Sequence, residues 1–376
     1  MKFKRYALSE LVTIKYGKNQ KKVLSADGNT PIYGTGGLIG YATTALYDKP
    51  SVLIGRKGTI GKVKYVEHPF WTVDTLFYTI INTNIVIPKY LYYVMSLIDL
   101  NNYNEGTTIP SLRTETLNRI EFDIPSLEEQ EIILSYLNPI DRKIELDNTI
   151  NNNLEQQAQA IFKSWFIDFH PFDGNRPIDW ITGIIDDLGA EIICGKTPVT
   201  KRKEYYGGNI PFITIPDMHG CVYNVSTERY LSAAGVASQP KKTLPPNTVC
   251  VSCIGTAGLV TLVSEKSQSN QQINAVVPKE GISVYYIYLL MQTLSETINK
   301  LGQSGSTIVN LNKTQFGKIP VTIPSEKVLR NFDTLCKPLF EMILSNQKEN
   351  IKLTNLRDTL LPRLMSGELD VSNIDL

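Results

Sequence analysis

The chain has 376 residues, 42% of them hydrophobic, which is enough for two domains that each bury a core of their own. The net charge of +1 argues against a protein that coats nucleic acid without selectivity. The most apolar run, residues 85–98, is shorter than the roughly 20 residues that cross a bilayer, and no apolar stretch follows the first residues. We therefore expect no membrane span, a cytoplasmic location and, with five cysteines, reduced thiols.

The sequence repeats itself at an offset of about 200 residues. The run GTIGKV at 58–63 is matched by GTAGLV at 255–260, and IEFDIPS at 120–126 is matched by IPVTIPS at 319–325. Each copy contains short β-type runs with Gly and Asn turns, a Tyr-rich helix (YLYYVMSLI or YIYLLMQTL), further strands and a long helix. The fold class expected for each copy is α+β, with domains at 1–126 and 171–325 and helical segments at 127–170 and 326–376.

The helical segments carry the 4-3 spacing of a coiled coil. Polar residues occupy the middle of both patterns, which lowers stability but fixes register and partner. We expect the two helices to pack on each other as an antiparallel coiled coil through these positions: Ile140, Ile144, Asp147, Asn151, Leu154, Ala158, Ile161 and Trp165, then Leu339, Ile343, Asn346, Asn350, Leu353, Arg357, Leu360 and Leu364.

Asn138 and Pro139 have the residue types of an N-cap and a first helical position. The sequence thus predicts that a helix from about Ser126 ends there and that a second helix runs from Pro139 to Asp168, about 45 Å at 1.5 Å per residue. Pro362 is expected to kink the distal helix near its end. A dimerisation helix is the alternative interpretation of the same spacing.

Charge is distributed unevenly along the chain. Residues 1–126 carry 15 basic and 10 acidic side chains, whereas residues 127–170 carry 3 and 8. The positive charge therefore lies in the mixed segments, and the first helical segment is acidic.

Motifs for catalysis and metal binding are weak. Cys250 and Cys253 form a lone C-x-x-C without a second ligand pair, and an apolar strand is the simpler explanation. The run YGTGG at 33–37 fails the G-x-G-x-x-G pattern because Ile39 takes the third glycine position. No G-x-x-x-x-G-K-[ST] motif is present, and the three histidines lie far apart. The sequence thus predicts no metal, no cofactor and no catalysis in this chain.

The segment NPIDRKIELDNTINNNLEQQAQAIFKSWFIDFHPF, residues 138–172, resembles the central conserved region of type I restriction-modification specificity subunits. The segment LTNLRDTLLPRLMSGEL, residues 353–369, resembles the second conserved region of that family, and PIYGTGGLIGY, WTVDTLFY and SNQQINAVV extend the similarity through both copies. The resemblance implies two target recognition domains, each for one half of an interrupted double-stranded DNA sequence, and helices that act as a spacer. It also implies two adenine methyltransferase subunits and two motor-endonuclease subunits as partners, which would hold the methyl donor, ATP and magnesium.

Turn residues of each copy are the candidates for DNA contacts, because their side chains combine cations for phosphates with donors and acceptors for base edges. In the first copy these are Lys18, Gln20, Lys21, Lys22, Thr35, Arg56, Lys57, Thr59, Thr107, Thr108 and Arg113. In the second copy they are Lys196, Thr197, Lys201, Arg202, Lys203, Tyr205, Thr256, Gln271, Gln272, Ser306, Thr307 and Asn310. Two other interpretations remain open, a stand-alone methyltransferase or nuclease and an adaptor that binds only protein.

Overall fold

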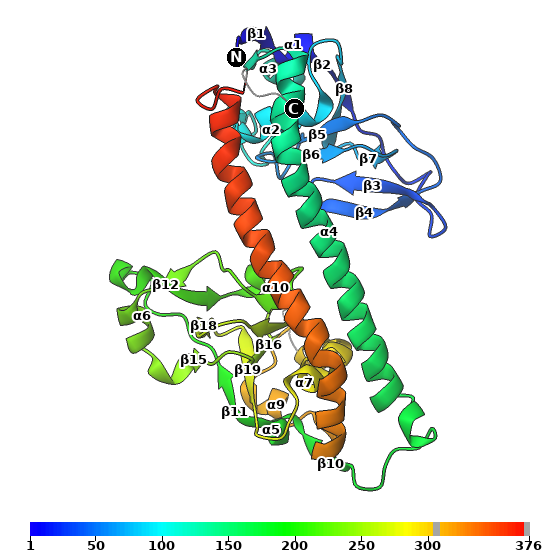
Figure 1. The fold of residues 1–376 in the computed structure, drawn as a ribbon, viewed down its shortest axis with the longest axis vertical. Helices are drawn as coiled ribbons and strands as arrows, with labels where there is room; N and C mark the ends of the chain where they lie inside the picture. Colours follow the sequence, from blue (N-terminus) through cyan, green and yellow to red (C-terminus); the bar gives the residue numbers. More distant parts are fainter. Residues whose placement is uncertain (304–308, 372–376) are drawn as a thin grey trace. The chain divides into compact units, whose positions relative to one another are not determined.

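The computed structural model describes residues 1–303 and 309–371 and divides the chain into two compact units. Unit 1 consists of Met1–Arg142 with Thr354–Leu376, and unit 2 of Lys143–Leu353. Each unit is a β-rich α+β domain that includes part of each of the two 40-residue helices, α4 (Leu127–Phe166) and α10 (Glu326–Met365) (Figure 1). Among the described helices, none has the length and apolar character to cross a membrane.

Unit 1 is built from three small sheets. Strand β1 (Lys4–Ala7) pairs with β9 (Glu121–Ile124) and so closes the domain. The four-stranded sheet has the order β2 (Val12–Tyr16), β8 (Leu76–Ile81), β5 (Ser51–Gly55), β6 (Val63–Val66), and the three-stranded sheet the order β4 (Gly37–Ala42), β3 (Thr30–Gly34), β7 (Trp71–Thr72). The short helices are α1 (Leu8–Leu11), the Tyr-rich α2 (Pro88–Ser96), η1 (Leu100–Tyr103) and α3 (Thr114–Asn118).

Unit 2 follows the same plan with additions. Strands β10 (Ile181–Ile184) and β20 (Pro320–Ile323) close it, and its larger sheet has the order β11 (Gly189–Cys194), β19 (Ile273–Pro278), β16 (Val249–Ser252), β17 (Val260–Val263), β13 (Tyr223–Asn224). The second sheet has the order β14 (Tyr230–Leu231), β12 (Tyr206–Ile213), β18 (Ser267–Ser269), β15 (Thr243–Leu244). The helices are η2 (His170–Phe172), α5 (Ile185–Leu188), η3 (Lys203–Tyr205), η4 (Ile215–Met218), α6 (Ala233–Ala237), η5 (Pro240–Lys242), α7 (Val284–Thr293), α8 (Ser295–Gly302) and α9 (Lys313–Gly317).

The duplication inferred from sequence is present in the strand pairing. The order β2-β8-β5-β6 in unit 1 corresponds to β11-β19-β16-β17 in unit 2. The parallel pairs β3–β7 and β12–β18 also correspond. The expected α+β class, the Tyr-rich helix of each copy (α2 and α7) and the tandem arrangement are thereby confirmed.

The predicted break in the first long helix is wrong. Helix α4 continues from Leu127 to Phe166 with Pro139 inside it. Buried Ile133, Leu134 and Leu137 precede the proline in the unit 1 core, and partly buried Ile140 follows it, so one apolar stripe continues past this position. We attribute the continuity to this packing, which outweighs the helix-breaking tendency of proline. Helix α10 likewise continues through Pro362 and ends at Met365.

Helices α4 and α10 pack together in both units and run antiparallel. In unit 2, Trp165 lies 6.0 Å from Phe332 between ring centroids, Asn346 donates to Asn151 (2.9 Å), and Lys143 pairs with Glu349 (3.1 Å). In unit 1, Arg357 donates to Asp141 (3.0 Å). As residue numbers rise along α4, the numbers of their partners on α10 fall, as an antiparallel pair requires.

The two ends of the helix pair have different chemistry. In unit 1 the Asp141 carboxylate accepts from Tyr93 (2.6 Å) and pairs with Lys89 (3.1 Å) and Arg357. Burial alone would raise the pKa of Asp141, but these hydrogen bonds and charges hold it below its usual range. In unit 2 the repeat-equivalent residue is Phe340, which stacks on Tyr285 with 4.6 Å between centroids.

We predict that Arg357→Ala lowers the free energy of unfolding by about 2 kcal/mol, because it removes a main partner of a largely buried carboxylate. Urea denaturation of the full chain measures this effect. Arg330→Ala is the matched control on the same helix, because its ion pair with Glu326 is exposed, and it should change stability by less than about 0.5 kcal/mol. Equal effects of the two substitutions would contradict the structural role of the Asp141 network.

Candidate nucleic-acid interface

Four loops of unit 1 meet at one edge of its sheets, at residues 17–22, 34–37, 55–61 and 104–113. We call the exposed side of these four loops surface 1. Two backbone hydrogen bonds join residues 55–61 to residues 104–113, and two more attach residues 17–22 and 55–61 to residues 72–75. Lys18 N–H donates to Thr72 (2.8 Å), Arg56 N–H to Thr75 (2.8 Å), Gly58 N–H to Pro110 (2.9 Å) and Leu112 N–H to Arg56 (3.0 Å). All eleven unit 1 candidates from the sequence lie on these loops.

Side chains on surface 1 differ in how firmly they are held. The Arg56 guanidinium lies over the Tyr16 ring (5.1 Å to the centroid) and donates to the Asp74 carbonyl (2.8 Å), so its position is fixed. Lys57 and Thr59 are exposed on the same turn. The Thr35 hydroxyl lies 3.9 Å from the place that a Cβ on Gly58 would take, which brings the β3–β4 turn beside this turn.

The remaining unit 1 candidates are exposed or half-buried on the loops around that turn. Arg113 pairs with Glu105 (3.1 Å), so part of its charge is already neutralised. The others are exposed except Gln20, which is half-buried: Lys18, Gln20, Lys21, Lys22, Thr107 and Thr108.

Unit 2 repeats the same loop framework, which we call surface 2 (residues 194–206, 253–256, 270–272 and 309–311). Here Lys196 N–H donates to Ser269 (2.8 Å), Cys253 N–H to Gln272 (2.8 Å), Gly255 N–H to Val309 (3.0 Å) and Leu311 N–H to Cys253 (2.9 Å). The four bonds correspond one by one to those of surface 1. Gly58 and Gly255 occupy the same place and both have positive φ, at +87° and +77°, so the turn requires glycine in both copies.

Amide and hydroxyl groups dominate the centre of surface 2. Thr197 donates to the Gln271 side chain (2.8 Å), and Gln272 accepts from Asn270 (2.9 Å). Thr256 and Asn310 are exposed beside them. Two further candidates, Ser306 and Thr307, lie outside the described residues.

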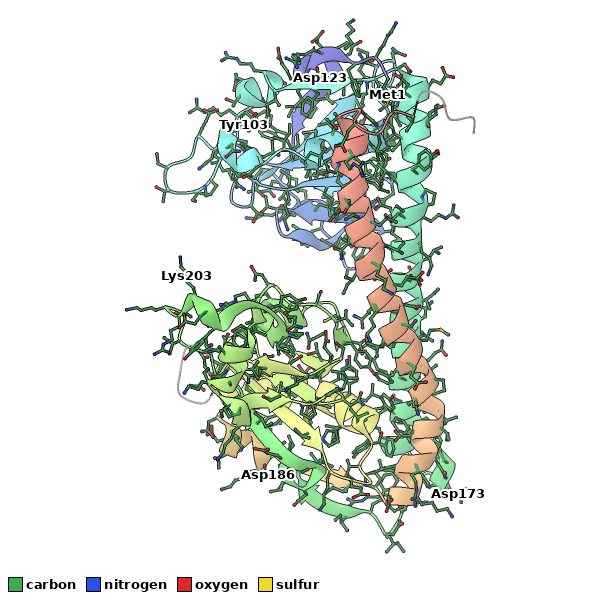
Figure 2. All side chains as sticks on the ribbon, turned by 60° about the vertical axis from the view of Figure 1, so that its left-hand side comes forward. Met1, Tyr103, Asp123, Asp173, Asp186 and Lys203 are labelled. Atoms are coloured by element: carbon green, nitrogen blue, oxygen red, sulfur yellow. The ribbon has the colours of Figure 1, made fainter. Side chains whose placement is uncertain are left out.

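A basic segment lies beside this centre. Lys201, Arg202 and Lys203 are exposed, and Arg202 donates to the Tyr205 hydroxyl (3.1 Å). Tyr206 donates to the Pro198 carbonyl (2.8 Å), which ties the basic segment to the turn that contains Lys196. Figure 2 shows Lys203 at the end of unit 2 remote from the long helices.

Sequence analysis missed one cation next to surface 2. Lys242 donates through Nζ to the Cys194 carbonyl (2.9 Å), next to the turn that contains Lys196. The run Pro240-Lys241-Lys242 in the sequence marks a basic turn, but no local sequence pattern shows that Lys242 lies next to Cys194 in the fold. The contact depends on the fold of the segment between β14 and β16, which unit 1 lacks.

The two cysteines of the C-x-x-C run belong to the core. Cys250 lies within β16 and Cys253 directly after it, both buried, and burial raises the pKa of each thiol to about 12. Residues 1–303 and 309–371 contain no group of three or more His, Cys, Asp or Glu side chains arranged to hold a metal ion. The YGTGG run forms the turn of the β3–β4 hairpin.

A groove of about 690 Å³ in unit 2 is lined mainly by amides and apolar side chains, among them Asn148, Asn152 and Gln347. Its carboxylate, Glu155, accepts from Tyr288 (2.8 Å) and Gln292 (2.7 Å). These bonds attach α4 to α7, so Glu155 has a packing role.

A duplicated α+β unit on a pair of long helices, with a polar turn surface in each copy, is the architecture of a tandem recognition protein. The turn surfaces offer cations, amides and hydroxyls, the groups that bind phosphates and base edges.

Comparison with known proteins identifies the family. The model for the type I restriction modification DNA specificity domain matches residues 1–156 and again residues 177–353. The chain is 33% identical to the HindI specificity subunit of Haemophilus influenzae, over 82% of this chain and 84% of that one, and 28% identical to the MjaIX specificity subunit of Methanocaldococcus jannaschii, over 88% and 80%. A type I system S subunit from M. genitalium has the same fold, with a TM-score of 0.61 at 17% identity over 97% and 96% of the two chains.

The chain belongs to this family and is a DNA specificity subunit of a type I restriction-modification system. The catalytic activities of such systems belong to other subunits.

We predict that changing Lys201, Arg202 and Lys203 together to Ala weakens DNA binding by the assembled complex and lowers its salt slope. The slope meant is that of the logarithm of the binding constant against the logarithm of the salt concentration. Each cation that neutralises a phosphate contributes about 0.9 to this slope, so the three substitutions should reduce its magnitude by about 2 to 3. Lys279→Ala is the control, because Lys279 follows β19 at the end opposite Gln271 and Gln272. An unchanged affinity and slope would remove the basic segment from the interface.

Proposed function

We propose that surface 1 and surface 2 each recognise one half of a bipartite, asymmetric target in double-stranded DNA. The observation that carries this proposal is the pair of equivalent loop frameworks with different side chains. Arg56 and Lys57 on the unit 1 turn correspond to Cys253 and Ile254 in unit 2, and Asp74 corresponds to Gln271. A common framework with different donors and acceptors is suited to reading two different half-sites.

In this proposal the helix pair fixes the spacing of the half-sites. Each helix has 40 residues, which is about 60 Å at 1.5 Å per residue, and a turn of duplex DNA is about 34 Å. The predicted coiled-coil positions support it: Asp147, Asn151 and Ile343 are buried, and Ile144, Asn346 and Asn350 are half-buried. The polar residues at the centre then serve to fix the register of α4 on α10.

We further propose that the helices dock two adenine methyltransferase subunits, and that two motor-endonuclease subunits join for cleavage in the cytoplasm. The relatives named above are specificity subunits of type I restriction enzymes, which supports partner subunits of this kind. The exposed, acidic face of α4 offers the charge for such a contact: Glu128, Glu131 and Glu145 are exposed there. Methyl donor, ATP and magnesium then belong to the partners.

A seven-residue insertion in both long helices tests the spacing, placed between Asn148 and Leu154 of α4 and between Asn346 and Asn350 of α10, which face each other. One heptad in each helix keeps the apolar positions of the pair in phase and adds about 10 Å to its length, so the gap should lengthen by up to about three base pairs with both half-sites kept. Mapping of methylated adenines in cells that carry the variant reads the gap directly. The same insertion between Gly174 and Asn175, in the connection after α4, should leave the gap unchanged, and an unaltered gap in the helix variant would contradict the proposal.

Two assays separate this function from the alternatives. With a labelled methyl donor, the purified chain should transfer no methyl group to DNA, and the complex with its methyltransferase subunits should transfer it to the target alone. Methylation or cleavage by the chain by itself would favour an enzyme. Failure of the complex to distinguish the target from a duplex with scrambled half-sites would favour an adaptor that binds only protein.

A further inference from the structure

The β3–β4 hairpin of unit 1 exposes an unusual amount of apolar surface. Leu24, Leu38 and Ile39 are each about half exposed (54%, 51% and 50%), and Tyr41 is 44% exposed. Strand β4 is an edge strand of its sheet, where exposed apolar residues favour aggregation. Such a cluster on an edge strand indicates a binding surface.

A β-bulge produces this exposure. Ile32 pairs with Gly40 and Tyr33 pairs with Leu38, so Ile39 is an additional residue in β4. The bulge interrupts the alternation of side chains between the two faces, and the two consecutive residues Leu38 and Ile39 are both exposed.

Leu24 extends the same patch from the preceding loop. It forms a bridge with Ala42, and its Cδ1 lies 2.8 Å from the place that a Cβ on Gly40 would take. Ser25 N–H donates to the Tyr41 carbonyl (3.0 Å). Leu24, Leu38, Ile39 and Tyr41 thus lie on the β3–β4 hairpin and on the loop segment bound to it, and we call these four residues the apolar hairpin.

Cations lie at two places next to the apolar hairpin. Lys21 and Lys22 are exposed in the loop that leads through Val23 to Leu24, and Thr35, in the β3–β4 turn, lies beside the turn that contains Arg56 and Lys57. The positive charge of these side chains is complementary to a phosphate backbone. It therefore favours DNA as the partner that binds the apolar hairpin. At the corresponding place in unit 2 the chain after β12 enters η4, where Ile215 and Met218 are buried, so the described residues there form no equivalent patch.

We propose that the apolar hairpin enters the major groove of the half-site read by unit 1 and that Leu38 and Ile39 contact the C5-methyl groups of thymines. A two-stranded β-ribbon fits this groove, and apolar side chains recognise the thymine methyl there. This inference rests on the proposed function, in which surface 1 reads one half-site of a target for adenine methylation, and every adenine of a half-site is paired with a thymine on the other strand. The lysines contact the flanking phosphates.

The test is binding of the assembled complex to targets in which single thymines are replaced by uracil, which lacks the methyl group. For the wild type, uracil in the unit 1 half-site should weaken binding about fourfold for each contacted methyl. The double variant Leu38→Ala with Ile39→Ala should bind the thymine and uracil targets equally. Leu97→Ala, an equally exposed leucine at the end of α2, should keep the wild-type penalty.

Two results would overturn the inference: no uracil penalty for the wild type in the unit 1 half-site, or the same penalty there in the double variant. A double variant that keeps the penalty but loses its methyltransferase subunits or changes its oligomeric state would show that the patch binds protein. Preference of the wild type for its target over scrambled half-sites, measured in the same series, shows whether the proposed function stands when this inference fails.

Discussion

The antiparallel pairing of α4 with α10 is the constraint on which the rest of the structure depends. Unit 1 completes its core with Leu361, Leu364 and Met365 from the far end of the chain, and unit 2 includes Ala158 and Phe162 of α4 in its core. Each domain therefore contains residues of both helices and depends on both for its folding. The hydrogen bond between buried Asn151 and half-buried Asn346 opposes slippage, because another register would leave the buried Asn151 amide without this partner.

This framework separates stability from recognition. The backbone bonds that join the recognition loops are the same in both units, at Gly58 and Pro110 in one and at Gly255 and Val309 in the other. Because main-chain groups hold the loops together, side chains on their exposed faces can differ without loss of the fold. The same scaffold can then present different side-chain chemistry on surface 1 and on surface 2, while catalysis remains with other subunits.

The sequence was sufficient to predict the duplication, the Tyr-rich helices and the long helical segments, because a repeat and a heptad spacing can be read from the order of the residues. They failed at Pro139, where tertiary packing of Ile133 and Leu137 keeps α4 continuous. The grouping of Arg56 with Thr75 and Pro110, the contact of Lys242 with residue 194 and the bulge at Ile39 all depend on the path of the chain between distant segments. No periodicity in the sequence encodes such long-range pairings.

The most direct measurement of the central claim uses a chain with two identical recognition domains, in which Lys4–Ile124 replaces Ile181–Ile323 between the closing strand pairs. Two copies of one domain on an antiparallel helix pair must read the same bases on opposite strands. Mapping of the methylated sequence in cells with this chain should therefore give an inverted repeat of the first half-site with the original gap. A target that keeps its second half-site, or two half-sites in direct orientation, would contradict the account.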